Sequence, residues 1–396
     1  MRATGTAPLL AQTPETLAAF AEAHGLPRFL PAQLLRWIHE RRVIDPSAMT
    51  DLSKPARLLV AERFASFRGT VRAHQVADDG TQKLLLGWDV GETSTHPAAP
   101  EPCIGSTPDA EPDEAGAASL PVLAAPSALD DGGRTSGAVG AERRTECVLI
   151  PTESRKTACV SSQVGCPVGC AFCASGLGGL EGNLDAGQIV EQVWRLAGLP
   201  GVGRISHVVF MGMGEPLANF TAVTEAIRIL NAPWGMGISA RRITISTVGL
   251  PAAIRRLCSF EIPVTLALSL HAPTDELRRT IIPWAEYATI EELLDACDEW
   301  FEKTGREITL EYILLGGVND RPEHAERLAE LARRLRANVN LIRYNEVRGI
   351  PFQRPATEDV RRFQTVLRNH AVNAHIRRSR GRDIAAACGQ LRHERR

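Results

Sequence analysis

Three cysteines in the middle of the chain are the residues best suited by type and spacing to do chemistry. Cys166, Cys170 and Cys173 follow the spacing C-x3-C-x2-C in a loop that also holds glycine and proline. Thiolates at this density are typical of zinc or iron–sulfur binding. A structural zinc site takes four ligands, and no histidine accompanies these three. On a four-iron cluster, three cysteines would leave one iron open to a small molecule. A structural metal site completed by a distant fourth cysteine is the alternative.

Two further cysteines stand near segments of unusual composition. Cys159 begins the run Cys159-Val-Ser-Ser-Gln-Val-Gly-Cys166, and Cys388 follows an arginine-rich stretch that starts at Arg377. Those arginines are either a solvated surface or contacts to RNA phosphates. Taken singly, Cys388 reads as a buried or incidental cysteine.

The segments that must position these cysteines alternate between strand and helix from residue 156 onward. Runs such as Ser206-His-Val-Val-Phe-Met are nearly all apolar, as expected for strands buried on both faces. This alternation predicts parallel βα units, and hence an α/β fold with a partial or full barrel. The predicted strands are 156–164, 205–213, 241–248, 263–270, 307–315 and 338–344. The predicted helices lie near 185–198, 219–231, 250–258, 289–303, 321–336 and 357–370.

Polar residues stand where four of the predicted strands end, which is the rim where barrels carry their sites. Gly214 allows close backbone approach, and the carboxylate of Glu215 can accept hydrogen bonds from an ammonium group. Each residue alone has a structural explanation, such as a helix cap, but four sets at equivalent positions indicate one site. The sets are Gly214 and Glu215 after the second strand, Ser246 at the third, Ser269-Leu270-His271 at the fourth, and Asn345 at the sixth.

The first ninety residues differ from the barrel region. Short helices are predicted from Pro14, from Pro31 and from about 56 to 64, and packing against the larger domain is favoured over a separate RNA-binding role. The segments 82–90 and 145–151 are predicted to be partner β-strands.

Residues 92–142, between those partner strands, contain no Phe, Tyr or Trp and are rich in Ala, Pro, Gly, Ser and acidic residues. We predict that this insert is disordered, because it cannot bury enough apolar surface to offset its ordering entropy. The expected domains are an N-terminal helical module with a β extension (1–90), the insert with its return strand (91–145), and the barrel with the Cys388 segment (146–396).

The composition is that of a soluble globular protein, with 44% hydrophobic and 23% charged residues. The net charge of −1 gives no global basic field, so any RNA-binding surface must be local. Nine cysteines in 396 residues, three of them clustered, fit a reducing compartment better than a disulfide framework. The start of the chain lacks the apolar stretch of a signal peptide, so we expect a cytoplasmic protein without membrane association.

Together these motifs closely resemble the RlmN/Cfr family of radical S-adenosylmethionine (SAM) RNA methyltransferases. The likeness rests on the Cys159–Cys166 run, the cysteine loop, Gly-Glu-Pro, Ser-Leu-His and Ala-Cys388-Gly-Gln-Leu, and it leans towards RlmN. It implies a radical SAM barrel with one 4Fe–4S cluster bound by Cys166, Cys170 and Cys173. It also implies SAM contacts from Gly214, Glu215, Ser246, Ser269, Leu270, His271 and Asn345.

The resemblance further implies a mechanism that uses two molecules of SAM. The first methylates the Cys388 thiolate, and the second is cleaved to a 5′-deoxyadenosyl radical that removes a hydrogen from that methyl group. The methylene radical adds to the amidine carbon of adenine. Cys159 then takes a proton from this carbon and attacks Cys388, which forms a disulfide and frees the product. Glu146 matches the family's proposed proton-transfer glutamate, with a strand-end surface carboxylate as the alternative.

The implied product is 2-methyladenosine in 23S rRNA, and in some family members also in tRNA. Methylation of carbon 8, as in Cfr, is the alternative. The other implied partner is an external electron donor such as flavodoxin, and the protein is expected to be a monomer. The sequence departs from the family pattern in the insert, in Asn345-Glu-Val-Arg-Gly, which lacks the usual proline, and in Cys173-Ala-Ser-Gly.

Overall fold

A ten-stranded sheet organises the part of the chain that the computed structural model describes, residues 7–88 and 142–391. Its order is β14-β13-β12-β11-β10-β9-β6-β5-β4-β3. The strands from β6 to β14 are parallel, whereas β5, β4 and β3 are antiparallel to their neighbours. The sheet ends at β14 and β3 without closing on itself, so the predicted partial barrel with a β extension is confirmed. The strands are β3 (Gly69–Val76), β4 (Gln82–Trp88), β5 (Arg143–Pro151), β6 (Lys156–Cys159), β9 (His207–Phe210), β10 (Ile243–Thr247), β11 (Thr265–Ser269), β12 (Thr309–Leu314), β13 (Asn338–Arg343) and β14 (Ala374–Arg377).

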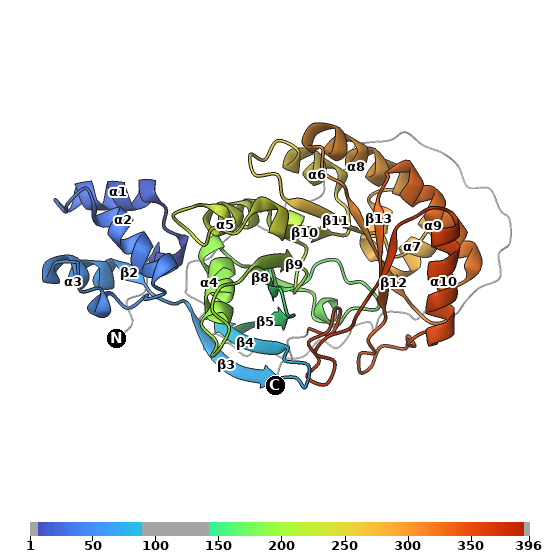
Figure 1. Cartoon of the computed structure of the whole chain (residues 1–396), viewed down its shortest axis with the longest axis horizontal. Coiled ribbons are helices and arrows are strands. Elements are labelled where there is room, and N and C mark those ends of the chain that lie inside the picture. Colours follow the sequence, from blue (N-terminus) through green and yellow to red (C-terminus); the bar gives the residue numbers. More distant parts are fainter. Residues whose placement is uncertain (1–6, 89–141, 392–396) are drawn as a thin grey trace, which may run out of the picture. The chain divides into compact units, whose positions relative to one another are not determined.

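Helices connect the parallel strands and cover the outer face of the sheet, as Figure 1 shows for α6, α8, α9 and α10 beside β10–β13. Their sequences contain the usual start signals. Asp185 and Gln188 form a capping box at the start of α4, and Thr289 and Glu292 do the same for α8. The helices are α4 (Ala186–Ala197), α5 (Phe220–Asn231), α6 (Pro251–Leu257), α7 (Asp275–Ile281), α8 (Ile290–Thr304), α9 (Pro322–Arg334) and α10 (Thr357–Asn369).

All the strands and helices predicted after residue 156 are present, with somewhat shorter bounds. The strand β8 (Leu180–Asn183), the helix α7 and the strand β14 were not predicted. Helix α7 has only seven residues, most of them polar, and β14 is a four-residue strand inside the arginine-rich stretch. Their own sequences are weak signals, and β14 is a strand because it pairs with β13 along Val339–Ile342.

The predicted N-terminal helices are also confirmed, as α1 (Pro14–Ala23), α2 (Leu30–Leu35) and α3 (Lys54–Arg63). Their buried residues share one hydrophobic core with the barrel. Helix α4 contacts the module directly, because the indole of Trp194 donates a hydrogen bond to the carbonyl of Ile38 at 3.0 Å. The guanidinium of Arg42 donates to the carbonyl of Ala197 at 3.1 Å.

The predicted partner strands pair as β4 and β5, from Gln82 opposite Leu149 to Trp88 opposite Arg143. The insert predicted to be disordered, 92–142, lies outside the described residues except for Glu142. The carboxylate of Glu142 forms ion pairs with Arg72 and Arg144. Within the described ranges, no helix has both the length and the hydropathy required to span a bilayer.

Candidate active site

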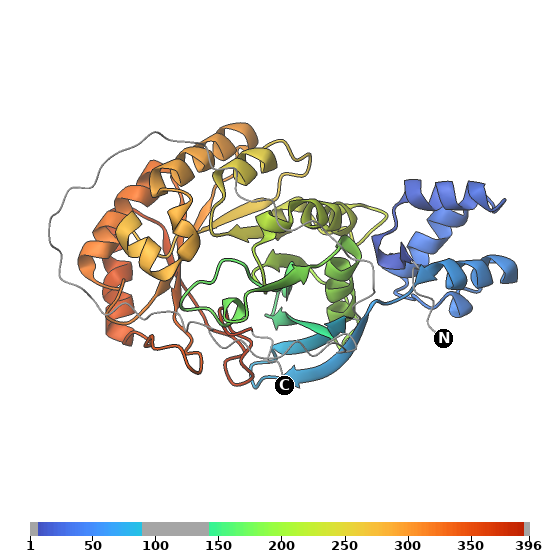
Figure 2. The same ribbon diagram turned by 180° about the vertical axis from the view of Figure 1, so that it is seen from behind.

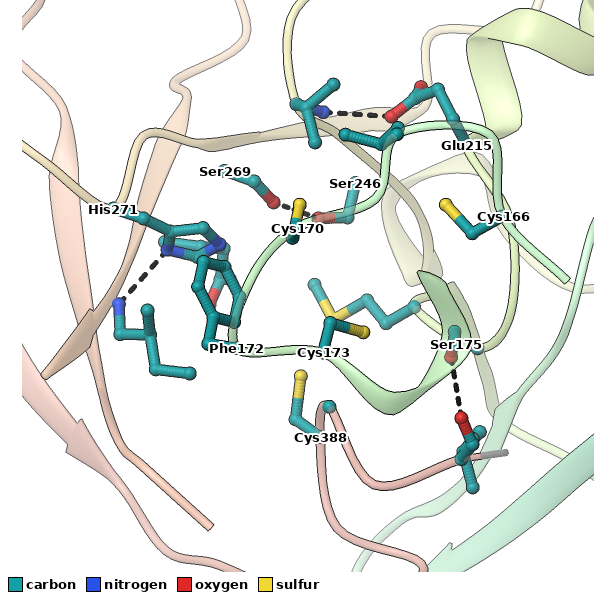
Figure 3. A pocket seen from close by; sticks show the side chains of 18 of the residues that line it. Cys166, Cys170, Phe172, Cys173, Ser175, Glu215, Ser246, Ser269, His271 and Cys388 are labelled. Carbon is teal, nitrogen blue, oxygen red and sulfur yellow. Dashed lines mark hydrogen bonds between the residues drawn. The ribbon is translucent and has the colours of Figure 1, made fainter. Parts of the chain in front are cut away.

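A cavity opens at the carboxyl ends of the parallel strands, and most of the predicted site residues line it (Figure 3). The cysteine loop forms one wall, and Cys388 enters from the C-terminal segment. The predicted residues that line the cavity are Cys166, Cys170, Cys173, Gly214, Glu215, Ser246, Ser269, His271 and Cys388. Parallel strands bring these residues together because their carboxyl ends meet at one edge of the sheet.

The cysteine loop follows the short strand β7 (Gln163–Gly165) and is fixed by its own backbone. The amide of Cys166 donates to the carbonyl of Gly179 at 3.0 Å, and the amide of Cys173 donates to the carbonyl of Cys170 at 3.0 Å. In the described residues, no three His, Cys, Asp or Glu side chains form a group that could hold a metal ion. The three cysteines of the loop are thus not arranged around a single point in the way that one zinc ion requires. Their arrangement is compatible with a multi-iron cluster, in which each thiolate binds a different iron.

Burial disfavours the loss of protons from the thiols of this loop. Burial raises the pKa of Cys166 to about 12, and burial also raises the pKa values of Cys170 and Cys173. A bound cation would reverse this preference, because a thiol that coordinates a metal is deprotonated outright. The three side chains could therefore hold an iron–sulfur cluster and are poorly suited to act as free nucleophiles.

At Gly214 the loop after β9 passes close to the backbone segment that holds Gln163. The φ of +100° at Gly214 favours glycine, and a Cβ there would lie 2.6 Å from the Cβ of Gln163. The next residue, Glu215, accepts hydrogen bonds from the amides of Val248 and Leu217, both at 2.9 Å. Burial nevertheless raises the pKa of Glu215 to about 6. A cationic group in the cavity would favour its ionised form.

The opposite side of the cavity carries the hydroxyl groups of Ser246 and Ser269 and the imidazole ring of His271. The hydroxyls of Ser246 and Ser269 lie 3.2 Å apart on neighbouring strands. His271 has a φ of 59°, which is rare for a residue with a side chain. Its Nδ1 accepts a hydrogen bond from the amide of Ile313 at 3.0 Å, so a neutral ring carries its proton on Nε2. Burial lowers the pKa of His271 to about 3, which keeps it neutral.

The C-terminal segment that carries Cys388 is fastened to the cysteine loop. The amide of Ala174 donates to the carbonyl of Gly389 at 2.8 Å, and the hydroxyl of Ser175 donates to the carbonyl of Leu391 at 2.7 Å. Asn345 lies behind this segment, where its amide donates to the carbonyl of Cys388 at 3.5 Å. The structure thus places Asn345 against Cys388 rather than among the residues that line the cavity.

Cys159 is buried at the end of β6, just behind the cavity. It packs with Met213 and with Ala386 and Leu391 of the C-terminal segment. Burial raises the pKa of Cys159 to about 12, the nearby Cys388 thiol contributes in the same direction, and the guanidinium of Arg377 opposes both. Among the described cysteines no disulfide is present, and both Cys159 and Cys388 are free thiols.

Besides Asn345 and Cys159, two further predicted residues lie away from the cavity wall. Leu270 is fully buried in the core, and its backbone amide donates to the carbonyl of Glu311 at 3.1 Å. Glu146 lies on β5, where it lines a neighbouring groove and forms an ion pair with Lys83 at 2.8 Å.

Sequence reasoning missed several polar or sulfur-containing residues of the site, among them Glu311, Met211 and Arg377. Glu311 and Met211 line the cavity, and Arg377 donates a hydrogen bond to the sulfur of Met211 at 3.3 Å. A lone carboxylate in the apolar run Ile308-Thr-Leu-Glu-Tyr-Ile-Leu-Leu was a usable signal for Glu311, since buried acids need a partner. Arg377 could not be distinguished from the other arginines of its stretch. That stretch was interpreted as a solvated surface or as contacts to RNA phosphates, and neither interpretation describes a half-buried strand residue.

Two family models match the chain. Residues 8–65 match the ribosomal RNA large subunit methyltransferase N-terminal domain, and residues 160–332 match the radical SAM superfamily.

Full-length relatives extend this match over nearly the whole chain. A probable dual-specificity RNA methyltransferase RlmN from Rhodopirellula baltica is 40% identical over 96% of this chain and 89% of its own length. A protein of the same description from Gloeobacter violaceus is 41% identical over 98% of this chain and 95% of its own length. The crystal structure of a radical SAM methyltransferase from Sphaerobacter thermophilus has a TM-score of 0.82 and 37% identity, and it covers 98% of this chain and 99% of that one. The chain therefore belongs to the RlmN family of radical SAM RNA methyltransferases.

Proposed function

We propose that this protein methylates carbon 2 of an adenosine in 23S rRNA, with tRNA as a second substrate, through a methylated Cys388. The observation that carries the proposal is the position of Cys388. It lines the same cavity as the three clustered cysteines, and Cys159 packs against the segment that bears it.

In this proposal Cys166, Cys170 and Cys173 hold one 4Fe–4S cluster, and the polar rim holds SAM beside it. When bound, the cluster and SAM together supply a 5′-deoxyadenosyl radical. Glu215 accepts hydrogen bonds from the amino group of SAM, and Ser246, Ser269 and His271 supply neutral polar contacts. The side-chain amide of Asn345 donates to the carbonyl of Cys388, so Asn345 would support SAM binding indirectly, by holding the segment that bears Cys388.

Cys388 takes the methyl group in a displacement that breaks the methyl–sulfonium bond of the first SAM. Burial raises the pKa of Cys388, and the guanidinium of Arg377 opposes this rise. Arg377 thus favours the thiolate that the displacement requires. After a hydrogen atom is removed from the methyl group, the resulting carbon radical adds to carbon 2 of adenine and leaves RNA attached to the Cys388 sulfur.

Cys159 and Glu146 then release the product. The register places Cys159 opposite Val148 on β5, two residues from Glu146 and on the same face of the sheet. The adduct is a radical, so it must lose one electron, which the oxidised cluster would accept, and the proton on carbon 2. Cys159 takes this proton, and Glu146 takes part in its transfer. Attack of the Cys159 thiolate on the Cys388 sulfur then breaks the bond between that sulfur and the methylene carbon, which keeps the electron pair and takes a proton to become the methyl group of the product. A disulfide is left, and an external reductant must restore the two thiols.

The substrate adenosine must be unpaired or flipped out, because its carbon 2 edge cannot be reached inside a helix. The proposal places the enzyme in the cytoplasm as a monomer that receives electrons from a donor such as flavodoxin.

Nucleoside mass spectrometry of 23S rRNA and tRNA tests this proposal, in cells with and without the protein. We expect 2-methyladenosine to disappear from the 23S rRNA of cells that lack the protein and to return with the wild-type gene but not with Cys388→Ala. Loss of 8-methyladenosine instead would establish the carbon 8 alternative. No change in either nucleoside would refute both.

A further inference from the structure

Lys83 is a buried lysine for which neither the motifs nor the proposed chemistry has a role. It lies on β4 with 7% of its surface exposed, and its ammonium group makes two polar contacts to the protein. One is the ion pair to the carboxylate of Glu146 at 2.8 Å, and the other is a hydrogen bond to the carbonyl of Ala385 at 3.2 Å. A lysine is almost never buried unless it is paired, because removing its charge from water is costly.

The strand register explains how Lys83 meets Glu146. Lys83 lies opposite Val148, and Glu146 lies opposite Leu85, so the two charged side chains are diagonal neighbours on one face of the antiparallel pair. That face forms one wall of a groove of about 650 Å³. The alternate residues of β4 and β5, such as Leu84 and Cys147, point to the other face and into the core.

The second contact ties this wall to the segment that bears Cys388. Ala385 has a φ of 50°, which is rare for a residue with a side chain, and it lies three residues before Cys388. Two hydrogen bonds also hold this segment to the β3–β4 turn. The amide of Gly381 donates to the carboxylate of Asp79 at 3.2 Å, and the amide of Asp78 donates to the carboxylate of Asp383 at 3.0 Å. Figure 2 shows the C-terminal segment, in red, beside the blue β3–β4 hairpin. The ammonium group therefore lies between the candidate base and the segment of the methyl-carrying cysteine.

We propose that Lys83 is a positioning residue that holds Glu146 as an ionised, correctly oriented base for the release step. This inference rests on the proposed function, in which Glu146 takes part in moving the proton. An opposite charge within 4 Å favours the carboxylate form, and the carbonyl of Ala385 fixes the ammonium group at that distance.

Other charged groups also face Glu146, and they set the background for its titration. Arg144 on β5 and Arg72 on β3 line the same groove, but both are ion-paired with Glu142. Glu346 and Arg348, of opposite charge, line it as well, and the neighbouring thiol of Cys147 is buried with its pKa raised. Lys83, by contrast, forms its ion pair with Glu146 itself.

The test is the pH dependence of product release by reconstituted holoenzyme, followed as loss of the covalent protein–RNA species in a single turnover. Lys83→Met should move the acid limb of this profile to higher pH by about one unit or more, so that release slows about tenfold at a pH on that limb and recovers at higher pH. Lys83→Arg keeps the charge and should restore the wild-type position of the limb. Methylation of Cys388, measured by protein mass spectrometry, should be unchanged, because that step does not use Glu146.

Arg195→Met is the matched control. Arg195 is also a largely buried cation that bridges a carboxylate and a carbonyl, with Glu191 at 2.8 Å and the backbone of Gly69, away from the cavity. Its loss should lower thermal stability without moving the pH profile. If Lys83→Met slows release equally at every pH, as a structural role would, the inference is overturned.

The double variant Lys83→Met/Glu146→Gln removes both charges of this ion pair together, so it keeps the test usable if the single variant fails to fold. Its release rate should equal that of Glu146→Gln alone, because Lys83 acts through Glu146. A further large loss would contradict the proposal. Wild-type release by Glu146→Gln would instead remove Glu146 from the proposed function, which is a separate failure.

Discussion

Cys159→Ala is expected to convert the enzyme into a trap that remains covalently attached to its RNA. Without the Cys159 sulfur, nothing displaces the bond between Cys388 and the methylene carbon, so the reaction stops after RNA has been joined. The attached species should migrate as a slow band on a denaturing gel and disappear on treatment with ribonuclease. Turnover should fall to background.

The control variants separate the two thiols, which a purely structural view would treat alike. Cys388→Ala and the Cys159/Cys388 double variant should give no slow band, because no bond to RNA can form. Cys147→Ala removes another buried free thiol from the adjacent strand and should behave like the wild type. A Cys159→Ala enzyme with normal turnover and no attached RNA would refute the assigned role.

Alanine at Cys166, Cys170 or Cys173 is expected to abolish both the iron–sulfur cluster and the cleavage of SAM. In the proposed cluster each thiolate would bind its own iron, so the loss of one thiolate leaves that iron without its protein ligand. Iron content, the visible absorbance of the cluster and production of 5′-deoxyadenosine measure the loss.

Cys258→Ala is the control for this series, because Cys258 is a free, partly buried thiol that follows the last residue of α6 and lies outside the cavity. It should keep its full iron content. A variant of the loop that retained iron, colour and 5′-deoxyadenosine would remove that cysteine from the ligand set.

The sequence predicted much of this fold because its signals were local and repeated. Apolar strands such as β11 and capped helices such as α8 contain their own start and stop residues, and their alternation leads to a parallel barrel. β14 and α7 could not be predicted in this way. They are short, and β14 depends on pairing with β13, a long-range contact that its own four residues do not encode.

The candidate site shows the same division. The cysteine loop and the strand-end residues were identifiable because their spacing or their position after a strand has a direct chemical meaning. Lys83 and Arg377 were not, because a lysine in a hairpin and an arginine among arginines look like ordinary surface residues. Only the register of β4 with β5, and of β13 with β14, shows that Lys83 faces Glu146 and that Arg377 turns towards Met211.

The most direct test of the central claim follows the hydrogens of the transferred methyl group. The holoenzyme would be supplied with SAM whose methyl group carries three deuterium atoms. Mass spectrometry would then measure the number of deuterium atoms in the modified nucleoside and in the 5′-deoxyadenosine. Transfer through Cys388 predicts a product methyl group with two deuterium atoms, and 5′-deoxyadenosine with the third. A product that keeps all three, with unlabelled 5′-deoxyadenosine, would show direct transfer from SAM to RNA and would contradict the account.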